Sequence, residues 1–206
     1  MNVTLFDYGA GNLHSLSKAL EAPDVVVRVE TDPVRAVGDG TDVLVLPGVG
    51  AFGAAAGRLA PGRERMRAAI LDGLPTIGIC LGMQLLFDGS DEGSGVGLGV
   101  IPGRVTRLRA VRVPQIGWNE VQAESSDRLF AAAPLPMVYY ANSYVCRPVD
   151  VGVVTAWTEH ETDRFPAAVR AGRAVGVQFH PEKSSAQGVR FLRAFLDDAR
   201  TMESLP

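Results

Sequence analysis

The stretch Gly78-Ile79-Cys80-Leu81-Gly82 decides the expected fold. The apolar run before it, residues 76–79, is typical of a buried strand, and residues 81–87 after it have helical character. Cys80 therefore occupies a sharp strand-to-helix turn, with glycines two residues to either side where larger side chains would clash. A strand that feeds directly into a helix is typical of βαβ units and predicts a parallel α/β sheet.

The first half of the chain repeats this alternation of strands and helices. Expected strands lie at residues 2–6, 25–29, 43–46 and 76–79. A helix with an apolar stripe of Leu13, Leu16 and Leu20 follows the first strand, and a helical stretch at 51–71 is interrupted near Pro61-Gly62. Strands that alternate with helices imply right-handed crossovers and a parallel core.

The second half contains closely spaced strand candidates at residues 105–108, 119–122, 138–140, 152–158, 167–170 and 174–179. Glycine and proline turns separate them, which predicts antiparallel pairing added to the parallel core. The glycine-rich residues 89–103 are a candidate mobile loop. An amphipathic helix at 186–200 closes the chain and is expected to bury the apolar residues Val189, Leu192, Phe195, Leu196 and Ala199.

Length and composition indicate an ordinary globular chain. Its 206 residues and 21.9 kDa suit a single domain spanning 1–206, and the 47% hydrophobic and 21% charged residues rule out a largely disordered chain. A net charge of −3 argues against a nucleic-acid partner, which needs a basic surface. Cys80 and Cys146 cannot form a disulfide scaffold. Phosphate loops, metal clusters and dinucleotide fingerprints are absent from the sequence, so we expect no cofactor and no metal.

The uncharged run at 129–146 is long enough on paper to cross a bilayer, but it contains Pro134 and Pro136. The first residues lack the basic segment of a secretory signal. We therefore expect no membrane association and a cytoplasmic location.

The turn at Cys80 suggests a nucleophile. The sulfur would be exposed at the carboxyl end of the sheet, where open α/β folds bind ligands. The helix N-terminus would stabilise a thiolate, and the backbone N–H of Leu81 would point toward a developing oxyanion. A small cysteine buried in a tight turn explains the motif equally well when it is taken alone.

Three histidines are available as a base, and His180 is the best placed. His14 lies on the first expected helix, and His160 lies in a polar stretch typical of a solvated surface. The proline after His180 keeps it near extended geometry, so that His180 and Glu182 can project to one side. Glu182 would accept a hydrogen bond from Nδ1 of His180, leaving Nε2 to take the thiol proton. This order differs from the Ser-Asp-His order of α/β-hydrolases.

Residues 78–84 together with His180-Pro181-Glu182 resemble the class I glutamine amidotransferases, whose sheet is flavodoxin-like. Further stretches resemble the glutaminase subunits of imidazole glycerol phosphate synthases. They run in the expected order from residue 7 to residue 184: Asp7-Tyr8-Gly9-Ala10-Gly11-Asn12-Leu13, Pro47-Gly48-Val49-Gly50, Gly117-Trp118-Asn119, Asn142-Ser143-Tyr144 and His180-Pro181-Glu182-Lys183-Ser184.

This resemblance implies hydrolysis of L-glutamine to glutamate and ammonia. Cys80 would attack the carboxamide carbon and form a glutamyl thioester, His180 would shuttle the proton, and Glu182 would orient the imidazole. The resemblance further implies an oxyanion hole at Val49, Gly50 and Leu81, and substrate-binding residues at Gly48, Gln84, Ser143 and Tyr144.

The resemblance also implies a heterodimer with a synthase (cyclase) subunit that is a (β/α)8 barrel. That subunit would use the ammonia to make imidazole glycerol phosphate and AICAR in histidine biosynthesis. Channelling has a physical reason, because ammonia released into water is protonated and is no longer a nucleophile. The implied interface residues are Asn12, Trp118, Tyr139 and Lys183.

The sequence departs from the family pattern at Asn142, where a histidine is usual. Asparagine keeps a donor and an acceptor but cannot carry charge. We expect this position to affect activation by the partner more than substrate binding.

Three alternatives stay open on the sequence alone. The chain could feed ammonia to another synthase, such as one that makes pyridoxal phosphate or anthranilate, although residues 7–13 and 117–119 argue against it. It could hydrolyse a different amide or a peptide. It could also be a non-catalytic subunit, although the complete set of Cys80, His180 and Glu182 weakens that interpretation.

Overall fold

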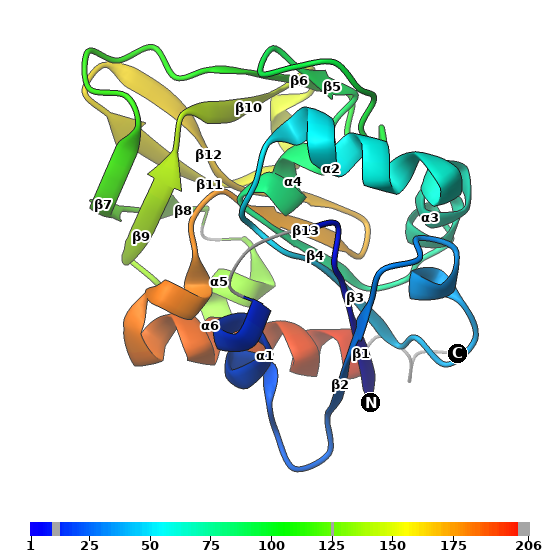
Figure 1. The fold of residues 1–206 in the computed structure, drawn as a ribbon. Helices are drawn as coiled ribbons and strands as arrows, with labels where there is room; N and C mark the ends of the chain where they lie inside the picture. The colour runs from blue at the N-terminus through cyan, green and yellow to red at the C-terminus, as the bar shows by residue number, and fades with distance from the viewer. Residues whose placement is uncertain (10–12, 125, 202–206) are drawn as a thin grey trace.

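The computed structural model describes residues 1–9, 13–124 and 126–201, and an eight-stranded sheet forms its centre (Figure 1). The strand order is β2-β1-β3-β4-β13-β12-β11-β8. The first five strands pair in parallel, and the last three continue the sheet with antiparallel pairing. The bounds are β1 Asn2–Phe6, β2 Val26–Glu30, β3 Val43–Leu46, β4 Thr76–Ile79, β8 Gln122–Ala123, β11 Val154–His160, β12 Asp163–Ala171 and β13 Ala174–Val177. The expected parallel core with an antiparallel extension is confirmed.

Helices cover both faces of this sheet (Figure 1). One face carries α1 (Leu13–Leu20), α5 (Arg128–Ala132) and α6 (Ser185–Thr201), and the other carries α2 (Phe52–Leu59), α3 (Arg63–Leu71) and α4 (Leu81–Leu85). The alternation within β3 shows why both faces are covered. Val43 and Val45 pack in the hydrophobic core under α1, α5 and α6, whereas Leu44 and Leu46 pack in the core under α2, α3 and α4. A central parallel strand is therefore apolar at every position.

Two smaller sheets stand beside the main one. One has the order β10-β6-β5, with bounds Tyr144–Pro148, Gly103–Arg107 and Gly89–Ser90. The other is a two-stranded antiparallel ribbon of β7 (Gln115–Glu120) and β9 (Met137–Asn142), which we call the β7/β9 ribbon. Among the residues that the structure describes, no helix is both long and apolar enough to span a bilayer.

Several local expectations differ from the structure. In α6, Val189 is only partly buried, and Phe191 and Gly188 are buried alongside the other expected residues. The glycine-rich residues 89–103 do not form a simple loop. They contain β5, and their backbone binds back to α4 and the residues after it, with Leu98 N–H donating to the Leu85 carbonyl and Val100 N–H to the Leu86 carbonyl.

Candidate active site

The turn between β4 and α4 places Cys80 in a backbone conformation that few residues adopt, with φ at 49° and ψ at −102°. The two flanking glycines are required sterically. A Cβ at Gly78 would lie 2.5 Å from the Gly82 carbonyl oxygen, and a Cβ at Gly82 would lie 2.0 Å from the Leu46 carbonyl oxygen. The residue itself is only 6% exposed, so the expectation of an exposed sulfur is wrong. Side chains and backbone from neighbouring elements cover it.

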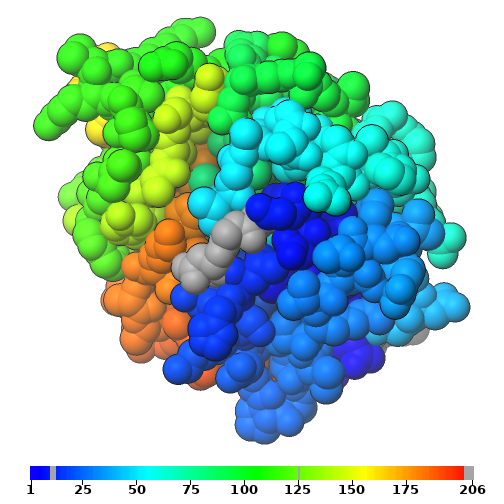
Figure 2. Space-filling view, viewed as in Figure 1, coloured from blue at the N-terminus to red at the C-terminus, as the bar shows by residue number. Residues whose placement is uncertain are grey.

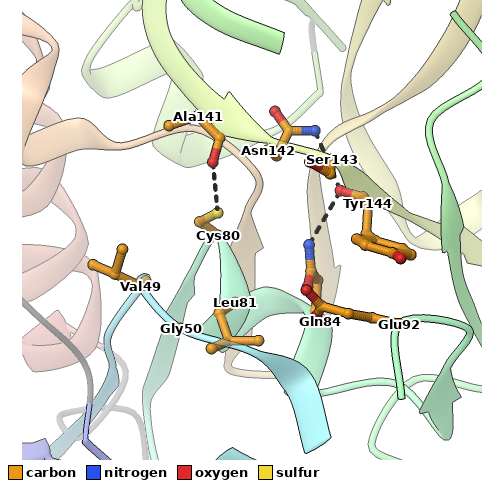
Figure 3. Close-up of a pocket in the computed structure, with 11 residues that line it drawn as sticks. Val49, Gly50, Cys80, Leu81, Gln84, Glu92, Ala141, Asn142, Ser143 and Tyr144 are labelled. Carbon is orange, nitrogen blue, oxygen red and sulfur yellow. Dashed lines mark hydrogen bonds between the residues drawn. The ribbon is translucent and has the colours of Figure 1, made fainter. Parts of the chain in front are cut away.

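A cavity of about 170 Å³ opens above Cys80 at the carboxyl ends of β3 and β4 (Figure 3). It gathers every residue that the sequence analysis assigned to the oxyanion hole and to substrate binding, although these come from segments distant in sequence. It also contains Glu92, Ala141 and Asn142, which were given no role there. The lining residues are Gly48, Val49, Gly50, Cys80, Leu81, Gln84, Glu92, Ala141, Asn142, Ser143 and Tyr144.

His180 and Glu182 form a buried pair beside this cavity. The Nδ1 atom of His180 lies 2.8 Å from Oε1 of Glu182, as the sequence predicts, and the imidazole is 1% exposed. Gly48 makes room for the ring, because a Cβ there would lie 3.0 Å from Cε1 of His180. Burial lowers the pKa of His180, but interactions with Cys80 and then Glu182 outweigh it and raise this pKa from 6.5 to about 10. The protonated imidazole is thus favoured beside the sulfur.

A chain of side-chain amides also reaches the sulfur. Nε2 of Gln84 donates to the Tyr144 carbonyl at 3.1 Å and to Oε1 of Gln178 at 3.4 Å. Nε2 of Gln178 in turn donates to Sγ of Cys80 at 3.4 Å. The Cys80 thiol also faces the Ala141 carbonyl at 4.0 Å (Figure 3).

Gln178 and Glu92 were both missed by the sequence analysis. For Gln178 a signal was present, since it lies in the expected strand at 174–179, two residues before His180, and alternate residues of a strand project to the same side. For Glu92 there was none. Its Oε2 accepts a hydrogen bond from the Phe52 N–H at the start of α2, 2.9 Å away, a long-range contact that local sequence does not show.

Three of the four implied interface residues lie together on the β7/β9 ribbon and next to it. The rings of Trp118 and Tyr139 meet edge to face at 6.2 Å, and Nζ of Lys183 lies 5.9 Å from the centre of the Tyr139 ring. In Figure 2 the yellow-green β9 lies directly against the orange segment that contains Lys183. The fourth residue, Asn12, lies outside the described residues.

Comparison with known proteins identifies the family. The model of the family described as glutamine amidotransferase class-I matches residues 4–199. The chain belongs to this family. The family expected from the sequence is therefore confirmed.

Its relatives include proteins named imidazole glycerol phosphate synthase subunit HisH. The one from Synechocystis sp. is 42% identical, over 94% of this chain and 95% of that protein. The one from Pyrococcus furiosus is 40% identical, over 94% and 97%.

Solved structures show the same fold at lower identity. A glutamine amidotransferase superposes with a TM-score of 0.73 at 21% identity, covering 96% of this chain and 98% of that one. The glutaminase domain of Trypanosoma brucei CTPS, solved with acivicin, gives a TM-score of 0.64 at 18% identity, covering 95% and 93%.

Proposed function

We propose that this chain is the glutaminase subunit of an imidazole glycerol phosphate synthase. It hydrolyses glutamine to glutamate and ammonia and passes the ammonia to a synthase subunit in histidine biosynthesis. One observation carries the proposal: Cys80, at a strand-to-helix turn, faces a pocket next to the buried His180–Glu182 pair, in a chain 42% identical to a named HisH subunit.

The reaction follows from the protonation state of this site. The Cys80 thiolate attacks the carboxamide carbon, and the Leu81 N–H with the peptide of Val49–Gly50 stabilises the oxyanion. The imidazolium of His180 gives its proton to the departing ammonia, leaving a glutamyl thioester. Neutral His180 then takes a proton from water, which attacks the thioester. Glutamate leaves, and the thiolate–imidazolium pair is restored. Glu182 keeps the imidazole oriented throughout.

The cavity also offers groups for the amino-acid end of glutamine. Glu92 places a carboxylate at its wall, which suits the α-ammonium group. Both N–H groups of the Gln84 amide are already engaged, so its Oε1 is the atom left to accept a hydrogen bond from substrate. Gly48, Ser143 and Tyr144 complete the wall that would contact the carboxylate and the methylene groups.

The outer face of the β7/β9 ribbon is where we place the synthase subunit, a (β/α)8 barrel. This face presents Ile116 at 67% exposure, Trp118 at 52% and Met137 at 42%. Clustered aromatic and apolar side chains of this kind are typical of interface anchors. Ala141 belongs to the same ribbon and lines the cavity, so the docking face and the pocket are continuous. Ammonia released there would pass to the partner, which makes imidazole glycerol phosphate and AICAR.

The test measures glutamate release by the full chain, alone and with the synthase subunit of the same organism plus its nucleotide substrate. We expect strong stimulation by the partner and a loss of about 10⁴-fold or more in Cys80→Ala. Cys146→Ser is the matched control, because that thiol is fully buried in β10 and should leave the rate unchanged. High activity that ignores the partner would instead favour a hydrolase of another amide. The thiol chemistry also fits a reducing compartment, so a cytoplasmic location is part of this proposal.

A further inference from the structure

Gln178 contacts the sulfur of Cys80 from within the protein. It directly follows β13, is 0% exposed and does not line the substrate cavity. Its Nε2 nonetheless lies 3.4 Å from Sγ of Cys80, within hydrogen-bonding range for sulfur. The contact therefore acts on the nucleophile without occupying space that glutamine would need.

The orientation of this amide is set by a group that can only accept. The Tyr144 carbonyl has no hydrogen to give, so the Gln84 amide turns its NH₂ toward it. The same NH₂ donates to Oε1 of Gln178, and this places the NH₂ of Gln178 toward Cys80. A reversed Gln178 amide would point its oxygen at the sulfur and its NH₂ at another donor.

The two neutral contacts of the sulfur favour opposite protonation states. The Ala141 carbonyl can accept from a thiol but repels a thiolate, and its distance of 4.0 Å makes it weak. The Gln178 NH₂ donates to a thiolate at a shorter distance. Hydrogen bonds to a charged acceptor are stronger than those to a neutral one, so the Gln178 contact would be stronger with a thiolate than with a thiol.

Among the described residues, the ionisable side chains that interact electrostatically with Cys80 are His180, Tyr8 and Cys146, and Glu92 and Tyr144 line the same cavity. Burial, followed by the charge of Cys80, raises the pKa values of Tyr8 and Cys146 well above their usual range, so both stay neutral. Tyr8 donates its hydroxyl hydrogen to the Pro47 carbonyl and not to the sulfur. Among the described side chains, His180 and Gln178 are positioned to stabilise a thiolate at Cys80.

The geometry points to Gln178 as a further catalytic residue, whose amide donates a hydrogen bond to the Cys80 thiolate while Gln84 and the Tyr144 carbonyl hold that amide in place. The assignment rests on Cys80 being the nucleophile of the proposed function. Gln178 thus adds a second donor to the sulfur. Unlike the imidazole of His180, which can lose its proton, the amide remains a donor at every pH.

The test is the pH profile of Cys80 alkylation by iodoacetamide in the full chain, followed by mass spectrometry of the Cys80 peptide. Only the thiolate reacts, so the profile reports its population. Gln178→Met keeps the size and removes the donor, and we expect its half-maximal pH to rise by about one to two units. Gln178→Glu places a carboxylate beside the sulfur and should raise it further.

Gln115→Met is the matched control. Gln115 is also buried, at 3% exposure, but its amide lies on the β7/β9 ribbon with no hydrogen-bond partner among the described residues, so its loss should leave the profile unchanged. Gln84→Leu removes the donor that orients Gln178 without contacting the sulfur, and it should shift the profile in the same direction by less.

Wild-type profiles in Gln178→Met, or in Gln178→Glu and Gln84→Leu if the methionine variant fails to fold, would overturn the assignment. Alkylation requires no glutamine turnover. A chain that fails to hydrolyse glutamine yet shows the expected shifts would refute the proposed function and leave Gln178 as a donor to the thiolate.

Discussion

The strand-to-helix turn at Cys80, which we call the elbow, and the β7/β9 ribbon meet at one cavity, yet they differ in how far this chain buries them. At the elbow every residue of α4 is buried, and the glycines on both sides have backbone atoms closer than any Cβ would tolerate. On the ribbon, Ile116 and Trp118 point away from the core and stay exposed. The elbow is complete within this chain, whereas the ribbon leaves apolar area uncovered.

Under the proposed function, the difference means that the elbow holds the catalytic residues and that the ribbon binds the partner. Cys80, His180 and Glu182 receive their geometry from the main sheet and its helices, so the chain alone should hold its nucleophile and base in place. The ribbon contributes Ala141, Asn142 and, at its end, Ser143 to the cavity wall. A partner bound to the outer face of the ribbon would therefore act on the cavity through the backbone of the ribbon.

We expect the largest effect from a substitution that breaks the buried His180–Glu182 pair. Glu182→Gln should lower the glutaminase rate of the complex by about 10³- to 10⁴-fold, as loss of the orienting carboxylate does in comparable triads. It should also lower the pKa of His180, because Glu182 is one of the groups that raise it to about 10. An NMR titration of the His180 ring measures this directly. A ring that titrates as in wild type would contradict the pairing.

The same variant has a pH-dependent stability signature. A folded-state pKa raised from 6.5 to about 10 means that the protonated ring stabilises the fold fully below pH 6.5, while Glu182 is ionised, and progressively less as the pH rises toward 10. The difference in unfolding free energy between wild type and Glu182→Gln should shrink across that window. Urea unfolding at several pH values tests the sign.

We expect the next largest effect from a substitution in the elbow itself. Gly82→Ala would place a Cβ 2.0 Å from the Leu46 carbonyl oxygen, a backbone atom that cannot move aside. We expect a loss of more than about 3 kcal/mol in the free energy of unfolding. Gly57→Ala is the control, because a Cβ on Gly57 in α2 would have no described atom within 4 Å beyond its own helix backbone, and alanine there should stabilise by about 0.5–1 kcal/mol. Equal stabilities of the two variants would show that the elbow is not sterically locked.

A smaller effect concerns the ribbon. Trp118→Ala should weaken binding of the synthase subunit by about 30-fold, since an aromatic anchor at an interface centre contributes about 2 kcal/mol or more. The stability of the isolated chain should change little, because the indole is half exposed and meets the Tyr139 ring edge to face on the ribbon surface. Val149→Ala, at an exposed valine outside the ribbon, should bind normally. Calorimetric titration with the synthase subunit distinguishes these outcomes, and unchanged affinity in Trp118→Ala would move the docking site elsewhere.

The elbow was also easier to predict than the ribbon and its surroundings. The bounds of β3 and β4 follow from short runs without charged residues, and the His180–Glu182 contact follows from a spacing of two residues. By contrast, β10 was missed because its partner β6 lies some forty residues away, and residues 142–144 look like a polar interruption in the sequence. Short α5 depends on a capping carboxylate, Asp127, which accepts from the N–H groups of Leu129 and Phe130. Local patterns predicted local geometry, whereas long-range pairing had no local signal.

The smallest expected effect lies at the junction of the two regions. Asn142 is the last residue of β9 and lines the cavity, where its Nδ2 donates to the Tyr144 carbonyl at 3.2 Å. Within the part of the chain that the structure describes, its buried Oδ1 has no hydrogen-bond partner. Asn142→His introduces a ring that can become charged at the end of the ribbon. We expect a several-fold change in the stimulation of glutamate release by the synthase subunit, with little change in the KM for glutamine. Glutaminase kinetics with and without the partner separate the two quantities, and equal changes in both would place Asn142 in substrate binding and remove it from the connection between the ribbon and the pocket.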